Sequence, residues 1–277
     1  MQFVSDVLTI ETHPGADPDA LVGTLWLDNV EARNAMGPAF WEDLPHAIDA
    51  LLDAGVRAIV LAAEGPHFSV GLDLKSMTGG ARQPGESQAA QRRRMYHDIK
   101  RLQAAITAIA DAPVPVIAAI HGWCIGGGID LICAADIRIA SADAKFSVRE
   151  TRVAITADVG TLQRLPGIVG AGHVAELVYT GADIDADRAA VIGLVKHVHP
   201  DRGAAIDAAR AMAAAIAANS PLAVQGSKAV LRAGADLTVA QGLDYVALWN
   251  AAFLPSNDLG EAMTAFLEKR PPHFTGD

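Results

Sequence analysis

A run of three glycines, Gly126 to Gly128, closely follows the apolar segment Val114 to Ile120 and most constrains how this chain folds. The apolar segment is uncharged and largely β-branched, as strands buried on both faces are. Glycine has no Cβ, so its backbone approaches other groups closely. A helix that begins at such a turn points its free N–H groups into the gap in front of it. The sequence therefore predicts a buried strand, a turn and a ligand site in succession.

Three acidic residues follow the glycines, and each lies in mostly uncharged surroundings: Asp130, Glu150 and Asp158. Carboxylates that lie near a site in apolar surroundings have raised pKa values, which suits proton transfer. Taken singly, each residue has a simpler interpretation. Asp130 fits an exposed helix position, Glu150 fits a surface ion pair with Arg149 or Arg152, and Asp158 fits a helix cap.

The composition bounds the class of protein. The 277 residues are 51% hydrophobic and 19% charged, which is enough for one large domain with a C-terminal appendage. The net charge of −10 disfavours general binding to nucleic acid or to anionic membranes. The two cysteines form no disulfide framework, which favours a reducing compartment.

Targeting signals are also absent from the sequence pattern. The N-terminal residues show no basic segment followed by an apolar core, so we expect no signal peptide. The longest uncharged run, Ala112 to Ile129, contains two prolines and four glycines and makes a poor membrane helix. From these features we expect a soluble, cytoplasmic protein.

The order of elements predicts an α/β fold. Strand-like segments at 7–11, 22–27, 58–63 and 114–120 alternate with helix-like segments at 38–54 and 89–111, and residues 79–88 predict a mobile loop. After Gly160 the pattern is mainly helical, with a short strand-like segment at 195–198 and N-caps expected at Asp236 and Ser256. We predict a core at residues 1–200, which carries the site, and a helical oligomerisation region at 201–277. The last helices are expected to cover the core or to pack against a neighbouring subunit.

Several motifs in register resemble the enoyl-CoA hydratase/isomerase, or crotonase, superfamily. They are RNAM at 33–36, HFSVGLDL at 67–74, HGWCIGGGIDL at 121–131, AADIRIA at 134–140, FSVRETRVAITADVGTLQRLP at 146–166 and AFLEKRPPHF at 265–274. The resemblance runs from about Leu25 to the C-terminus. It implies a spiral of ββα repeats followed by a helical trimerisation region. It also implies homotrimers, often paired into hexamers, with acyl-CoA thioesters as substrates and no metal or further cofactor.

The acids distinguish reactions within that superfamily. The resemblance to hydratases would place glutamate at the positions of Asp130 and Glu150, and a small residue at the position of Asp158. The set found here resembles the Δ(3,5)-Δ(2,4)-dienoyl-CoA isomerase group instead. That resemblance implies that Glu150 handles the proton at C2 of the acyl chain and Asp158 the proton at C6, while Asp130 holds the geometry.

The resemblance also implies the remaining site residues. The backbone N–H groups of Leu72 and Gly127 would form an oxyanion hole for the thioester oxygen. Substrate and coenzyme A would be bound by five further residues: Arg33, Ala35, Gly71, Gly126 and Lys269.

Two other functions stay open on the sequence alone. One is a 2-enoyl-CoA hydratase, or another crotonase-type reaction on an acyl-CoA. The other is a non-catalytic protein of the same fold that binds RNA or a protein partner, which the net charge of −10 disfavours for RNA.

Overall fold

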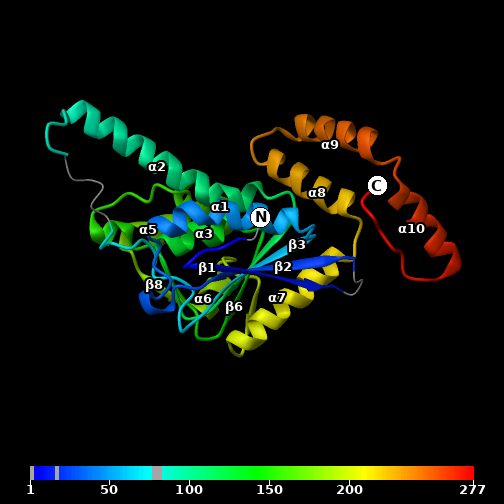
Figure 1. Ribbon diagram of the computed structural model, residues 1–277, viewed down its shortest axis with the longest axis horizontal. Coiled ribbons are helices and arrows are strands. Elements are labelled where there is room, and N and C mark those ends of the chain that lie inside the picture. The colour runs from blue at the N-terminus through cyan, green and yellow to red at the C-terminus, as the bar shows by residue number, and fades with distance from the viewer. Residues whose placement is uncertain (1–2, 16–18, 77–82) are drawn as a thin grey trace.

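A six-stranded sheet organises the computed structural model, which describes residues 3–15, 19–76 and 83–277 (Figure 1). The strands lie in the order β1 (Leu8–Pro14), β2 (Leu21–Leu27), β3 (Ala58–Ala63), β4 (Val116–Ile120), β6 (Ile137–Ser141) and β9 (His197–His199). The pair β1–β2 is antiparallel, and the other neighbours are parallel. A smaller sheet contains β5 (Trp123–Ile125), β7 (Lys145–Ser147) and β8 (Asp183–Asp185). The predicted α/β class is confirmed.

Both faces of the main sheet are buried, which explains why its strands read as continuous apolar runs. In β3, Ile59 and Leu61 pack into one hydrophobic cluster, while Val60 and Ala62 pack into another on the opposite face. Successive side chains of a strand point to opposite faces, so a sheet covered on both sides needs apolar residues at every position.

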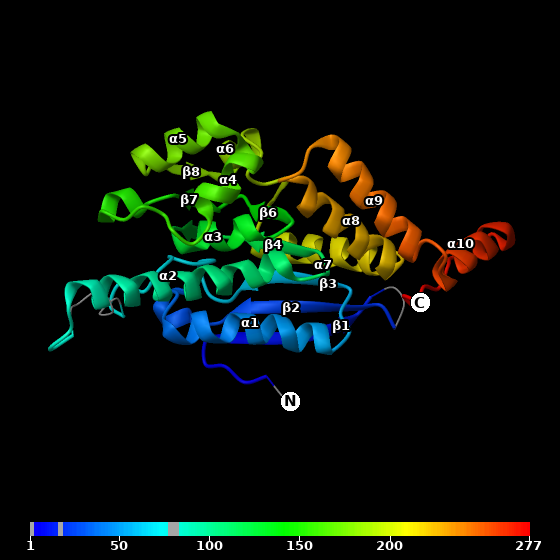
Figure 2. The same ribbon diagram turned by 90° about the horizontal axis from the view of Figure 1, so that it is seen from above.

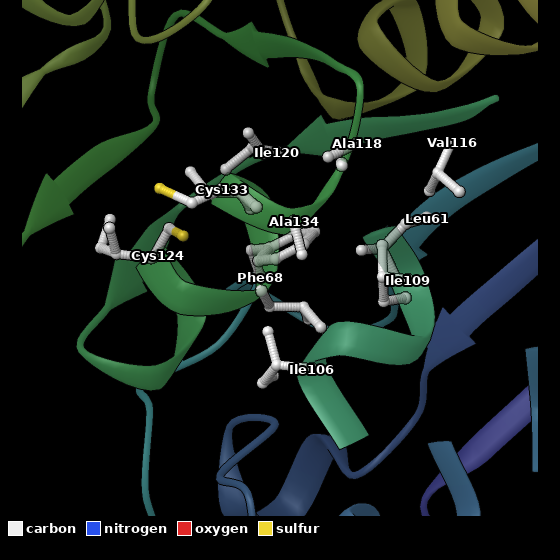
Figure 3. Packing of buried hydrophobic residues seen from close by; sticks show 14 of the residues in the cluster. Leu61, Phe68, Ile106, Ile109, Val116, Ala118, Ile120, Cys124, Cys133 and Ala134 are labelled. Carbon is white, nitrogen blue, oxygen red and sulfur yellow. The ribbon is translucent and has the colours of Figure 1, made fainter. Parts of the chain in front are cut away.

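The larger cluster lies between the sheet and three helices: α1 (Pro38–Asp53), α2 (Gln88–Asp111) and α3 (Gly127–Ala134). Figure 3 shows Phe68 between Ile106 of α2 and Ala134 of α3. Both cysteines are buried and free, as expected for small apolar side chains. All eight residues of α3 are buried, so the glycine turn that begins it is held firmly in place.

The opposite face of the sheet is covered by α7 (Arg202–Ala217). Its buried residues are mostly alanines, such as Ala209 and Ala213, which let the helix approach the sheet closely. We predicted that the oligomerisation region begins at residue 201, but α7, which begins at Arg202, packs on the sheet of the core. Where the oligomerisation region begins stays a prediction.

The rest of the chain is helical with short connections. On the site side lie η1 (Val30–Ala32), η3 (Glu150–Val153), α4 (Thr161–Val169), α5 (Ala171–Thr180) and α6 (Ala186–Val191). The last three helices, α8 (Pro221–Gly234), α9 (Val239–Phe253) and α10 (Asn257–Glu268), extend away from the sheets as an arm (Figures 1 and 2). None of the residues of α9 is buried.

Short elements were the part of the fold that the sequence did not reveal. Strands β5, β7 and β8 have three residues each, too few for an alternation of apolar and polar side chains to show. The N-cap expected at Ser256 is confirmed, but the one expected at Asp236 is wrong, because Thr238 caps α9 through a capping box with Gln241. The predicted mobile loop at 79–88 falls partly on residues 77–82, which lie outside the described residues.

An ion pair between a buried lysine and a partly exposed aspartate connects the arm to the core. The Lys228 ammonium of α8 lies 2.7 Å from Asp136 Oδ2 and 2.9 Å from the carbonyl oxygen of Val114. The lysine side chain is only 8% exposed. By contrast, the pair between Arg232 and Asp111 is about half exposed on both sides.

We expect Lys228→Ala to lower the free energy of unfolding by about 2–3 kcal/mol, because it leaves the Val114 carbonyl without its donor and the Asp136 carboxylate with only the backbone N–H of Val116. Arg232→Ala, which breaks an exposed pair on the same helix, should cost less than about 1 kcal/mol. Urea denaturation followed by circular dichroism measures both. Equal losses in the two variants would contradict the importance of the Lys228–Asp136 pair.

Candidate active site

Two segments that lie far apart in sequence pair edge to edge beside the glycine turn. The backbone N–H of Ser69 donates to the carbonyl of Trp123 at 2.9 Å, and the N–H of Ile125 donates to the carbonyl of Ser69 at 3.0 Å. Both segments end at a glycine with positive φ, 83° at Gly71 and 54° at Gly126. The pairing therefore brings the Gly71–Leu72 peptide against the start of α3.

Glycine is required on both sides of this contact. A Cβ on Gly71 would lie 2.6 Å from the carbonyl oxygen of Ile125. A Cβ on Gly127 would lie 2.8 Å from Met36 Sδ and 3.7 Å from the backbone nitrogen of Leu72. At Gly71 the contact is with backbone, so a side chain there would force the two peptides apart. At Gly127 the contact is with a side chain, so the buried Met36 would have to move.

The approach places two backbone donors side by side. Throughout the described chain, the N–H groups of Leu72 and Gly127 donate to no protein acceptor. Buried backbone donors are rarely left unpaired, so two at one point indicate a site for an anion or a polarised carbonyl. The sequence resemblance predicts an oxyanion hole at these two N–H groups, and that role stays a prediction.

Glu150 lies next to these donors, at the start of η3. A Cβ on Gly126 would lie 3.6 Å from Glu150 Oε1. The other carboxylate oxygen, Oε2, is buried and has no hydrogen-bond partner among the described residues. Burial raises the pKa of Glu150, and the negative charge of Asp158 raises it further. A carboxylate that is poorly solvated and close to two unpaired N–H groups is suited to remove a proton.

Asp130 is the most buried of the three acids, with 1% of its surface exposed. Its Oδ1 accepts a 2.5 Å hydrogen bond from the backbone N–H of Thr161, the first residue of α4. Burial raises the pKa of Asp130 to about 7, against the lowering effect of hydrogen bonds from Thr161. Asp130 thus connects α3 to the start of α4.

Asp158 lies in the irregular segment just before α4 and is partly buried. Its carbonyl oxygen accepts a 2.6 Å hydrogen bond from the side-chain amide of Gln103 in α2. Burial is the largest cause that raises the pKa of its carboxyl group. Within the described residues, none of the three acids forms a salt bridge that would stabilise its charged form.

A cavity of about 500 Å³ brings these groups together. Eight of the predicted site residues line it: Arg33, Gly71, Leu72, Gly126, Gly127, Asp130, Glu150 and Asp158. Ala35 and Lys269 do not line it, and Lys269 is exposed at the end of α10 in the arm. Their predicted contacts with coenzyme A remain predictions.

The apolar wall of the cavity was not predicted from the sequence. It includes Trp41, Leu74, Leu102, Trp123, Val153 and Ile155, which come from separate helices, strands and loops. Nothing in the local sequence distinguishes these residues from core residues. The wall makes the cavity suitable for an alkyl or alkenyl chain, since such sites are lined mainly by apolar and aromatic groups.

In the described parts of the chain, no group of three histidine, cysteine or acidic residues is arranged to hold a metal ion. No described helix combines the length and the apolar character needed to cross a bilayer.

Comparison with known proteins identifies the family. The model of the family described as enoyl-CoA hydratase/isomerase matches residues 18–277. The chain belongs to this family. A Δ(3,5)-Δ(2,4)-dienoyl-CoA isomerase of Dictyostelium discoideum is 44% identical over 91% of this chain and 87% of its own. The corresponding protein of Arabidopsis thaliana is 43% identical over 92% and 93%.

The solved structures of enoyl-CoA hydratase/isomerase proteins agree with the fold. A putative enoyl-CoA hydratase from Streptomyces coelicolor A3(2) superposes with a TM-score of 0.88, at 32% identity, over 100% of this chain and 97% of its own. The crotonase-like fold that the sequence motifs predicted is therefore confirmed, as is membership of the superfamily.

The expected cellular location is corrected by the same comparison. We expected a cytoplasmic protein, but the relative from Dictyostelium is named as mitochondrial and the one from Arabidopsis as peroxisomal. The acidic composition and the two cysteines do not distinguish the cytoplasm from such organelles, so the expectation was wrong.

The raised pKa of Asp130 predicts a pH dependence of stability. The carboxyl group binds its proton more tightly in the folded state, with a pKa of about 7 against an ordinary value of 3.8. The free energy of unfolding of the wild type should therefore fall as the pH rises through this window, by at most about 1.4 kcal/mol per pH unit. Asp130→Asn cannot ionise and should show a flatter profile in denaturation series from pH 4 to pH 8. Parallel profiles for the two proteins would contradict the raised pKa.

Proposed function

We propose that this protein is an isomerase that converts 3,5-dienoyl-CoA thioesters to their 2,4-dienoyl isomers. The observation that carries this proposal is the third carboxylate: Asp158 lines the same cavity as Glu150 and the two unpaired backbone donors. The identities of 43–44% with proteins named as isomerases of this type support it.

The reaction begins at the oxyanion hole. The thioester oxygen accepts hydrogen bonds from the N–H groups of Leu72 and Gly127. Glu150 removes a proton from C2, and the electron pair of the broken C–H bond moves into an extended enolate with its charge on that oxygen. Each preorganised donor aimed at the developing charge lowers the barrier by roughly 3–4 kcal/mol.

The second half of the reaction occurs four carbons away. Asp158, in its protonated form, gives a proton to C6, a new C–H bond forms, and the double bonds shift into conjugation with the thioester. One proton leaves the substrate and one is added, so the product is an isomer and no oxidant or reductant is consumed. Afterwards Glu150 holds a proton and Asp158 lacks one, and exchange with solvent restores both.

The proposal therefore includes no metal and no redox cofactor, and coenzyme A enters as part of the substrate. Asp130 touches the start of α4 through Thr161, so its part is to hold the site and to influence the protonation of the other two acids. Arg33 lines the cavity and is a candidate contact for coenzyme A, together with Ala35 and with Lys269 of the same or a neighbouring chain.

We also propose that the protein forms homotrimers, alone or paired into hexamers. The arm of α8, α9 and α10 exposes many large apolar side chains: Leu231, Val239, Leu243, Leu248, Met263, Phe266 and Leu267 are each more than half exposed. Apolar surface of this extent on three successive helices is typical of an interface between protein chains.

A hydratase is the second candidate. It would use two acids, Asp130 and Glu150, around one water molecule. A third carboxylate in the cavity disfavours it, since Asp158 would crowd the space of that water and raise the cost of ionising the other acids. A non-catalytic RNA-binding protein is disfavoured by the net charge of −10 and by the acids that line the cavity.

Asp158→Asn distinguishes the two enzymes. The substitution keeps the size of the side chain but removes the proton donor, so we expect dienoyl-CoA isomerisation to fall by about 10²–10⁴-fold. The rise in absorbance of the conjugated product measures it. Hydration of a 2-enoyl-CoA is measured in parallel, and Glu150→Gln serves as a control that should abolish isomerisation. Dominant hydration that Asp158→Asn leaves intact would instead identify a hydratase.

Charge on the arm should break the oligomer. Leu243→Glu combined with Leu248→Glu places two carboxylates on α9, and we expect sedimentation velocity to show a monomer in place of the trimer or hexamer. Tyr179→Glu, which changes an 80% exposed residue outside the arm, is the matched control and should leave the assembly unchanged. A monomeric wild type would contradict the proposed assembly.

A further inference from the structure

The segment that carries Asp158 is held by α2 rather than by its own neighbours. Between Thr156 and Val159, the main chain of the described protein receives hydrogen bonds from only two other residues. The shorter one, 2.6 Å, runs from Gln103 Nε2 to the Asp158 carbonyl. The longer one, 3.5 Å, runs from Arg164 to the Val159 carbonyl. Ala157 and Val159 of this segment are buried, but with so few hydrogen bonds its main chain depends strongly on each of them.

The orientation of the Gln103 amide is itself fixed. The ammonium of Lys100, three residues earlier in α2, lies 2.8 Å from Gln103 Oε1. A lysine ammonium only donates hydrogen bonds, so the oxygen of the amide faces Lys100 and the NH₂ group faces Asp158. Lys100 thus donates to Gln103, and Gln103 donates to the Asp158 carbonyl, in one short chain of hydrogen bonds.

The helix beneath Gln103 is a firm support. The buried residues of α2 are Ala105, Ile106 and Ile109, all within two turns after Gln103, and they pack into the main core. One turn after Gln103, Thr107 of the same helix accepts a 2.9 Å hydrogen bond from Arg164. The C-terminal half of α2 therefore contacts the Asp158 segment through Gln103 and, one turn later, α4 through Thr107.

We infer that Gln103 is a positioning residue, which fixes the main chain of Asp158 so that its carboxyl group reaches C6 of the substrate. This inference rests on the proposed function. Gln103 does not line the cavity, so it acts through Asp158 and not on the substrate. Glu150 and the oxyanion hole lie on other elements, so removal of C2 protons should not depend on Gln103.

Two variants remove the amide donor: Gln103→Glu keeps the shape of the side chain, and Gln103→Leu replaces it with an apolar side chain. We expect kcat for isomerisation to fall about 10–100-fold in both, because displacements near 1 Å reduce proton transfer by such factors. KM should change by less than about threefold, because substrate contacts are intact. Gln163→Leu, at an exposed glutamine of the adjacent α4, is the matched control and should keep the wild-type kcat.

A second readout separates positioning from general damage to the site. The reaction is run in D₂O, and the unreacted 3,5-dienoyl-CoA is recovered and analysed for deuterium at C2. In the Gln103 variants the enolate should still form, but it should more often be reprotonated at C2 than protonated at C6. The ratio of deuterium incorporated at C2 to product formed should therefore rise by the same 10–100-fold. Thermal denaturation of every variant checks that the proteins are folded.

The outcomes are distinct. A loss of isomerisation with retained C2 exchange supports the inference. Loss of both together, or variants that behave like the wild type, would overturn it while leaving the proposed function in place. A wild-type protein that neither isomerises the substrate nor exchanges its C2 protons would overturn the proposed function and this inference together.

Discussion

Two backbone N–H groups without a protein acceptor are held at one buried point, and much of the fold is arranged around them. Leaving buried donors unpaired costs free energy, so the neighbouring structure has to hold these N–H groups in position. Strand-like pairing of residues 68–71 with β5 and the buried side chain of Asn34 do so. The Asn34 amide donates to the carbonyls of Glu64 and His67 at 2.9 Å each. Ser69 Oγ in turn donates to the Asn34 carbonyl at 2.7 Å.

The three acids differ in how they are held, and this difference suits different roles. Asp130 has a strong backbone hydrogen bond and almost no exposure, so it is bound to the structure. Glu150 has an oxygen with no hydrogen-bond partner within the described chain, so its carboxylate remains available to a ligand. Asp158 is attached through its main chain, which leaves its side chain free to face the cavity. Burial raises the pKa values of all three carboxyl groups, and mutual repulsion raises those of Asp130 and Glu150 further. A mixture of charged and protonated acids is therefore the favoured state near neutral pH.

Elements with a long and regular pattern could be predicted from the sequence, and contacts between distant segments could not. The strand at Ala58–Ala63 was predicted with the bounds that the structure shows. The glycines and the three acids were singled out by their apolar surroundings, and the family motifs supplied the roles predicted for them. Gln103 carries no such signal, since a glutamine in a helix is ordinary until the fold brings it to the Asp158 carbonyl 55 residues away. Thr238 replaced Asp236 as a cap because its reciprocal contact with Gln241 decided where α9 begins.

The attachment of Asp158 to α2 has a consequence for the span of the reaction. Glu150 belongs to the part of the chain that follows β7, whereas Asp158 takes its position from a helix packed on the core through Ala105 and Ile106. The separation between the two carboxyl groups to which we assign the proton transfers therefore depends on the volume of side chains beneath that helix. A change of one methyl group there would alter the distance between the acids without touching either of them. In such a scaffold, core packing sets the distance that the two acids span along a bound acyl chain.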